Sequence, residues 1–139
     1  MLGTRHDDVV LLTAPSDSVP RSDPYCTKAG ARVLDAIVAQ LGSMSHSAVV
    51  KDDSWASARI GSSGNVNVSI VWVPPESGDR FTWALQFSEN RGCLDLFYTS
   101  RRVSAEALEV RQAVFAAAQR APGLLNVRWI DALEFRRVY

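Results

Sequence analysis

Hydrophobic and polar residues alternate along the middle of the chain with a period of two, which is typical of β-strands. The four segments with this period cover residues 55–60, 66–73, 81–87 and 93–98. The breaks between them are rich in glycine, proline, serine and asparagine, which favour turns. Because strands joined by such short turns pair in opposite directions, the pattern predicts an antiparallel meander.

The alternation also predicts which face of this sheet is buried. The second and third segments place their large apolar residues on one face, namely Val66, Val68, Ile70, Trp72, Phe81, Trp83, Leu85 and Phe87. The opposite face of the same segments carries polar or small residues, namely Asn67, Ser69, Thr82, Ala84 and Gln86. We therefore expect the apolar face to lie in the core and the other face to meet solvent or a partner.

Two helices are predicted, one on each side of the meander. The first begins with Asp23 as its cap and Pro24 at the first helical position, and Gly42 is placed to end it. Its apolar residues form one stripe, which suits a helix that lies on a sheet. The second helix follows Ser104, a good capping residue, and stops at the Pro-Gly pair of residues 122–123.

The two ends of the chain complete the expected fold. Residues 1–23 are interpreted as a leader and connector, in which residues 9–12 could add an edge strand, and residues 24–139 as a single α+β domain. Residues 127–130 predict another strand, and residues 133–139 a strand or an ordered tail. The expected architecture is a two-layer sandwich, with an antiparallel sheet of four to six strands and two helices on one face.

Composition restricts the classes of function. A chain of 139 residues with 47% hydrophobic and 22% charged residues is expected to form one soluble globular domain. Its 15 basic and 15 acidic residues give a formal net charge of zero, which argues against a dedicated nucleic-acid binder. No run approaches the roughly 18 apolar residues of a membrane span, and no secretory signal is recognisable. We therefore expect a cytoplasmic protein with no membrane partner.

The charges are unevenly distributed, because residues 99–139 contain 7 of the basic but only 4 of the acidic residues. The acidic residues close to the strand turns are Asp52, Asp53, Glu76 and Asp79. We expect these carboxylates to form a patch for a basic partner. Trp55 shares its strand face with Ser57 and Arg59, so it is expected to be an exposed anchor beside this patch.

Candidate catalytic chemistry is sparse. The sequence contains no recognisable motif for catalysis, metal binding or nucleotide binding, so neither a cofactor nor a metal is expected. Cys93, His46 and Asp95 can be grouped as a hypothetical polar site. Arg111 falls inside the apolar stripe of the second helix, where its guanidinium needs a carboxylate or a route to solvent, and Asp95 is the expected partner. These four residues would line a pocket between sheet and helices.

The order of elements between residues 24 and 131 resembles that of the small immunity proteins that neutralise bacterial polymorphic or contact-dependent toxins. The resemblance implies a non-enzymatic domain that binds a cognate toxin, here with a basic surface, and holds its active site or groove shut. Two alternatives stay open. The chain could be a small enzyme or ligand-binding domain that uses the pocket described above, or a secretion chaperone. The sequence leaves the oligomeric state undetermined.

Overall fold

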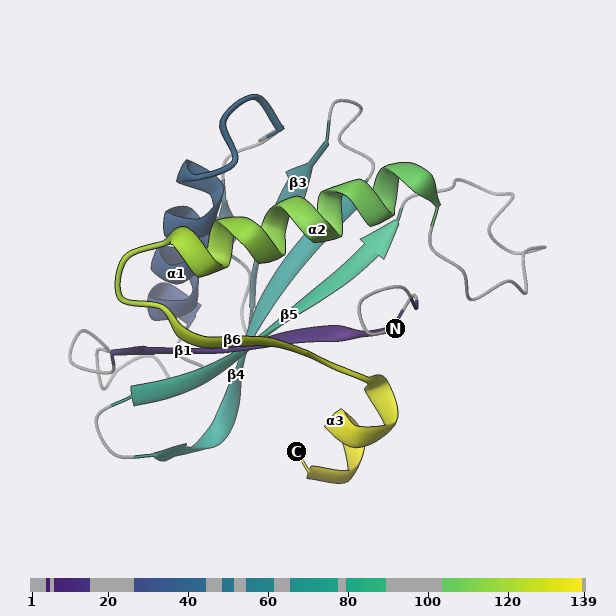
Figure 1. The fold of residues 1–139 in the computed structure, drawn as a ribbon. Coiled ribbons are helices and arrows are strands. Elements are labelled where there is room, and N and C mark those ends of the chain that lie inside the picture. The colour runs from purple at the N-terminus through teal and green to yellow at the C-terminus, as the bar shows by residue number, and fades with distance from the viewer. Residues whose placement is uncertain are drawn as a thin grey trace.

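The fold is built on one antiparallel β-sheet, drawn in Figure 1. The computed structural model describes residues 5, 7–15, 27–44, 49–51, 55–61, 66–77, 80–89 and 104–138. The six strands lie in the spatial order β2 (Val50–Lys51), β3 (Ala56–Ile60), β4 (Val66–Ser77), β5 (Arg80–Glu89), β1 (Val9–Pro15) and β6 (Leu125–Ile130). Every neighbouring pair is antiparallel, as the sequence pattern predicted.

Two helices cover one face of this sheet, α1 (Thr27–Ala39) and α2 (Ala105–Arg120), as Figure 1 shows. A short 3₁₀ helix, η1 (Gly42–Met44), follows α1. The main core lies between these helices and the sheet, and it contains Leu34 and Ile37 of α1 together with Val110 and Val114 of α2. The predicted α+β architecture is therefore confirmed.

The predicted apolar sheet face is the one that the helices cover. Seven of its eight residues are buried, and the eighth, Trp72, is partly buried and packed against the same core. Gly30 allows α1 to approach this face closely, since a Cβ atom there would stand 2.9 Å from Cζ3 of Trp83. The first helix therefore needs a residue without a side chain at this position.

Local capping signals set the ends of both main helices. The Ser104 side chain accepts a hydrogen bond from the backbone N–H of Ala107, which confirms the predicted cap of α2. The helix ends at Arg120, and Gly123 then adopts a φ of +81°. Gly42 follows α1 with a φ of +60°, where glycine is favoured. The predicted first cap, Asp23 with Pro24, lies outside the described residues.

The expected edge strand of the leader is instead an interior strand. β1 pairs with β5 on one side and with β6 on the other. Its residues are buried on both faces of the sheet, since Val10 and Leu12 belong to the main core while Val9 and Leu11 pack on the opposite side. An uninterrupted apolar run is typical of such a strand, because neither of its faces meets water.

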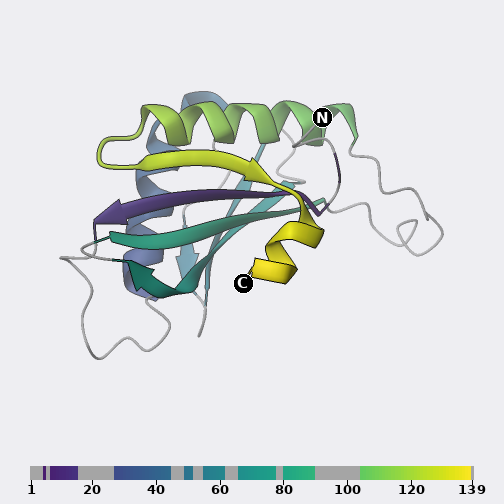
Figure 2. The same ribbon diagram turned by 60° about the horizontal axis from the view of Figure 1, so that its bottom comes forward.

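The C-terminal segment forms a helix, α3 (Ala132–Val138), so the predicted strand or tail over residues 133–139 was wrong. The Asp131 carboxylate accepts a hydrogen bond from the backbone N–H of Glu134 at 2.8 Å and thereby caps this helix. Figure 2 shows α3 on the side of the sheet opposite to α2. The fourth predicted strand, residues 93–98, lies outside the described residues.

The face of the sheet opposite to α1 and α2 is called the second face below. It is not uniformly polar, because Val9, Leu11, Val73, Ala84 and Ile130 form a small buried cluster there. Phe135 of α3 packs on this cluster. The expectation of an uncovered second face is thus correct only for part of it, since α3 supplies apolar surface that no strand pattern revealed.

Candidate functional site

The open part of the second face is a strip of short polar side chains on β3, β4 and β5. Two rows that cross the paired strands make up this polar strip, Ser57–Ser69–Gln86 and Arg59–Asn67–Ser88. Asn67 donates a hydrogen bond from Nδ2 to Oγ of Ser69 at 3.3 Å. All six side chains are at least partly exposed, so the strip offers hydrogen-bonding groups to a partner.

An exposed tryptophan borders the polar strip. Trp55 directly precedes Ala56, whose side chain is in the core, so alternation places Trp55 on the second face. Its side chain is 43% exposed, as the sequence pattern predicted. Trp55 is level with Val71 of β4, because Ala56 pairs with Ile70.

Two further large apolar side chains are exposed on the same side of the sheet, beyond β1 from Trp55. Leu125 of β6 is 54% exposed and pairs with Thr13, which places it on the second face. Leu133 of α3, the helix that lies on this face, is 75% exposed. Within the described ranges, these residues and Trp55 are the exposed large hydrophobic residues. All of them therefore belong to the second face or to the helix on it.

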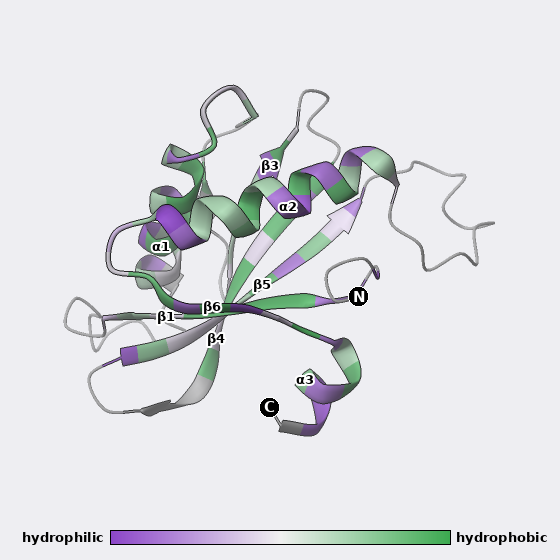
Figure 3. Ribbon diagram, in the orientation of Figure 1, coloured by the Kyte–Doolittle hydropathy of each residue, from purple (hydrophilic) through white to green (hydrophobic). Residues whose placement is uncertain are grey.

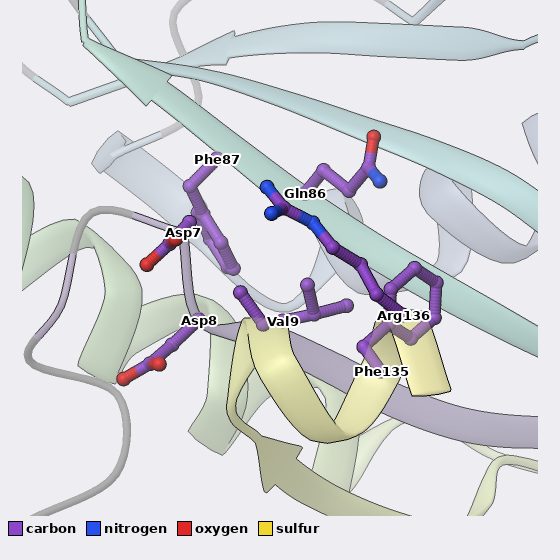
Figure 4. Close-up of a pocket in the computed structure, with 8 residues that line it drawn as sticks. Asp7, Asp8, Val9, Gln86, Phe87, Phe135 and Arg136 are labelled. Atoms are coloured by element: carbon purple, nitrogen blue, oxygen red, sulfur yellow. The ribbon is translucent and has the colours of Figure 1, made fainter. Parts of the chain in front are cut away.

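A hollow lies between α3, β5 and the start of β1, and Figure 4 shows its lining. This aromatic hollow has a volume of about 310 Å³ and is lined by Asp7, Asp8, Val9, Gln86, Phe87, Ala132, Phe135 and Arg136. Arg136 extends from α3 toward Gln86 and Phe87, whereas the carboxylates of Asp7 and Asp8 point away from it (Figure 4). The hollow thus combines aromatic walls with a guanidinium that reaches across it.

A β-bulge forms a second hollow at the other end of this face. Leu11 of β1 pairs with Arg128 and Thr13 with Leu125, so one residue of β1 faces two residues of β6. Asn126 in the bulge has a φ of +56°, a left-handed conformation that asparagine tolerates better than most residues. The bulge hollow has a volume of about 430 Å³ and is lined by Leu11, Leu12, Thr13, Thr82, Asn126, Val127 and Arg128.

Arg111 lies inside the protein and not in either hollow. Its side chain is only 2% exposed, and its guanidinium carbon lies 4.8 Å from the centre of the Phe87 ring. Nη1 donates a hydrogen bond to the backbone oxygen of Asp8 at 3.4 Å. Burial lowers the pKa of Arg111, while the nearby carboxylates of Asp8, Glu89 and Asp7 act in the opposite direction. This arginine therefore connects α2 to the start of β1.

The structure places only some of the predicted site residues. His46, Asp52, Asp53, Asp79, Cys93 and Asp95 lie outside the described residues. Glu76 belongs to β4, five positions beyond the level of Trp55. Glu76 lies in the irregular stretch of β4, where the register with β5 shifts between Val73 and Ser77. The predicted pocket around Arg111 stays a prediction, because its other members are not described.

Sequence reasoning missed α3 and the bulge. A signal for α3 was present, because Asp131 followed three residues later by Glu134 is the spacing of a helix cap. Asn126 alone gave no comparable signal, since a bulge depends on the partner strand.

The described residues contain no group of three or more His, Cys, Asp and Glu side chains that could hold a metal ion. None of their helices is long and apolar enough to cross a membrane. No family model, curated protein or solved structure matches this chain.

Proposed function

We propose that this chain is a protein-binding domain that engages its partner through the second face. The observation that carries the proposal is the position of Trp55, Leu125 and Leu133, the exposed large apolar side chains of the described residues. Trp55 directly precedes β3, Leu125 belongs to β6 and Leu133 to α3, and all three lie on or above one face. Exposed apolar side chains gathered on one face and separated by polar groups are typical of a protein interface.

The shape of the second face supports a macromolecular partner. The polar strip carries short side chains beside Trp55, while α3 stands above the sheet next to it (Figure 2). A partner that filled the space over the strip would contact Trp55 at one border and α3 at the other. Figure 3 shows hydrophilic positions in β6 and α3 beside the hydrophobic β1, which is the mixed surface expected at such an interface.

We further propose that the partner is a toxin, which this domain binds and neutralises in the manner of an immunity protein. The support is the resemblance in element order, since an α+β sheet with two covering helices fits it. The expectation of a basic toxin depends on Asp52, Asp53 and Asp79, which lie outside the described residues, and it stays a prediction.

A co-expression experiment tests this function. Domains encoded by the genes next to this one would first be screened for toxicity in a bacterium. A toxic domain found in this way would then be expressed with and without the full chain. We expect the wild-type chain to restore growth and Trp55→Ala to weaken the rescue. The control is Gln119→Ala, an exposed position of α2 on the opposite layer, which should rescue as well as wild type.

Two outcomes would contradict the proposed function. If the purified chain forms no complex with that toxin domain and gives no rescue, the toxin-neutralising function is wrong. If Trp55→Ala and Gln119→Ala both rescue fully and bind with wild-type affinity, the second face is not the interface. Circular dichroism of both variants checks that the fold is retained.

A further inference from the structure

The charged side chains on the strands of the second face are all arginines within the described part of the chain. Arg59 of β3 lies on the same face as Ser57, and Arg80 of β5 lies on the same face as Thr82. Arg128 of β6 lies on this face because it pairs with Leu11. No Asp or Glu side chain that the structure describes on these strands points to the same face, since Glu89 contacts Ser104 at the start of α2. The strands therefore give this face positive charge.

The charge of Arg80 is held by neutral oxygen atoms. Nε donates to Oγ1 of Thr13 at 3.0 Å, and Nη2 donates to the backbone oxygens of Thr13 at 2.9 Å and of Gly123 at 2.8 Å. These bonds fix the guanidinium in place without neutralising it, because none of the acceptors carries a formal charge. A fixed cation whose described hydrogen-bond partners are neutral attracts anions more strongly than a solvated, paired one.

Arg80 adjoins the bulge hollow through Thr13, which lines it. The Thr13 hydroxyl is fully used, because it accepts from Arg80 and from Nδ2 of Asn126 at 3.4 Å and donates to the backbone oxygen of Leu125 at 3.3 Å. Arg128 lines the same hollow with an exposed side chain, for which the described residues provide no hydrogen bond or ion pair. Arg128 thus lines the hollow itself, and the Arg80 guanidinium is held at its border by the Thr13 hydroxyl.

The bulge creates this arrangement. In a regular strand, residues three positions apart point to opposite faces. The extra residue in β6 instead places both Leu125 and Arg128 on the second face, opposite Thr13 and Leu11. An exposed apolar side chain and a cation consequently flank the hollow together, as expected for a surface that binds an acidic side chain and its apolar neighbour.

We infer that the second face binds an acidic protein surface, and that the bulge hollow receives a carboxylate from it, held by Arg128 near Arg80. This inference rests on the proposed protein-binding function and names the chemistry of the partner at this face. It differs from the expected basic toxin, which depends on Asp52, Asp53 and Asp79 outside the described residues. Arginine suits the role because its planar guanidinium forms two parallel hydrogen bonds with a carboxylate.

A protein fits these observations better than a nucleic acid. The chain has no net charge, and α3 balances Arg136 and Arg137 with Asp131 and Glu134. A nucleic-acid surface needs a larger excess of positive charge to neutralise successive phosphates. Leu125, exposed beside the bulge, suits the apolar part of a protein interface.

The test uses the full chain and a capped polyglutamate peptide as the probe, followed by backbone amide NMR shifts. We expect saturable shifts centred on Thr82, Asn126 and Arg128. Arg128→Gln should weaken binding about tenfold or more, because it removes a charge-assisted pair of hydrogen bonds. The matched control, Arg137→Gln, makes the same charge change at an exposed position outside the hollow and should alter affinity less than about twofold.

Several results would overturn the inference. Equal losses in Arg128→Gln and Arg137→Gln would mean non-specific attraction, and equal binding of capped polyglutamine would exclude recognition of charge. Tighter binding of oligothymidylate at the same amides would assign the face to nucleic acid. If the peptide does not bind while Trp55→Ala still weakens toxin rescue, only the acidic-partner inference is wrong. If the peptide binds as expected and rescue fails, the toxin-neutralising function is wrong instead.

Discussion

Arg111 of α2 donates a hydrogen bond to the backbone oxygen of Asp8, 103 positions earlier in the chain and one residue before β1. Both residues are only 2% exposed, so a cation and an acidic residue are buried together where helix and sheet meet. The carboxylate of Asp8 also accepts a hydrogen bond from the backbone N–H of Arg5 at 3.2 Å. These contacts tie the N-terminal strand to the second helix.

Removing the guanidinium should destabilise the fold. Arg111→Met keeps most of the side-chain volume but leaves the buried Asp8 without its neighbouring cation, so we expect a loss of about 3 kcal/mol in the free energy of unfolding. Asp8→Asn in the same chain should recover part of this loss, because it removes the buried negative charge. Urea denaturation of the two single variants and the double variant measures the coupling, and strictly additive losses would show that the two residues are independent.

Gly30 should tolerate alanine only if Trp83 is made smaller. Gly30→Ala gains about 1 kcal/mol of helix propensity, but its Cβ would stand 2.9 Å from Cζ3 of Trp83. Overpacking typically costs about 1–3 kcal/mol, so the variant should be less stable than wild type. In a Trp83→Phe background the clashing atom is absent and the same substitution should become stabilising. Thermal unfolding of the four proteins tests this change of sign, and its absence would exclude the steric explanation.

Arg80 should contribute more to stability than its exposure suggests. Arg80→Lys cannot reproduce the three hydrogen bonds to Thr13 and Gly123, so we expect a loss of about 1–2 kcal/mol. Arg128→Lys is the matched control and should change the free energy of unfolding by less than about 0.5 kcal/mol. Chemical denaturation compares the two variants. Similar effects of both substitutions would mean that the bonds of Arg80 do not hold β5, β1 and the turn after α2 together.

Ser104 should be needed for the first turn of α2. Ser104→Ala removes the acceptor for the backbone N–H of Ala107, and loss of a cap costs about 1 kcal/mol. Ser104→Thr keeps the hydroxyl and should restore most of the stability. Hydrogen exchange of the Ala107 amide gives a local measurement, since it should accelerate in the alanine variant alone. Unchanged exchange would contradict the capping role.

The parts of the fold that could be predicted depend on residues that are close together in the sequence. The buried faces of β4 and β5 follow from alternation, and the ends of α2 follow from Ser104 and Gly123. The exposure of Trp55 followed in the same way, from its place on the polar face of its strand. Such features need only the period of the backbone and the chemistry of a few adjacent residues.

Other features depend on partners that are distant in the sequence. The position of β1 between β5 and β6 requires two pairings with segments far along the chain, and local pattern cannot choose among strands. The contact of Arg111 with Asp8 joins residues 103 positions apart, and local pattern gives no reason to pair them. The predicted partner, Asp95, lies outside the described residues. The candidate site shares this difficulty, because Trp55, Leu125 and Leu133 are brought to one face only by the sheet.

The sequence alone therefore determined the class of fold, the helices α1 and α2, and the apolar and polar faces of the meander, because these follow from periodicity and capping within short segments. Only the tertiary structure decided the order of the strands, the bulge at Asn126 and the helix α3 over the second face. The tertiary structure also decided that Arg59, Arg80 and Arg128 lie on the same face of the sheet. The physical reason is that burial, charge compensation and strand register are properties of pairs of residues, and the chain sets those pairs only when it folds.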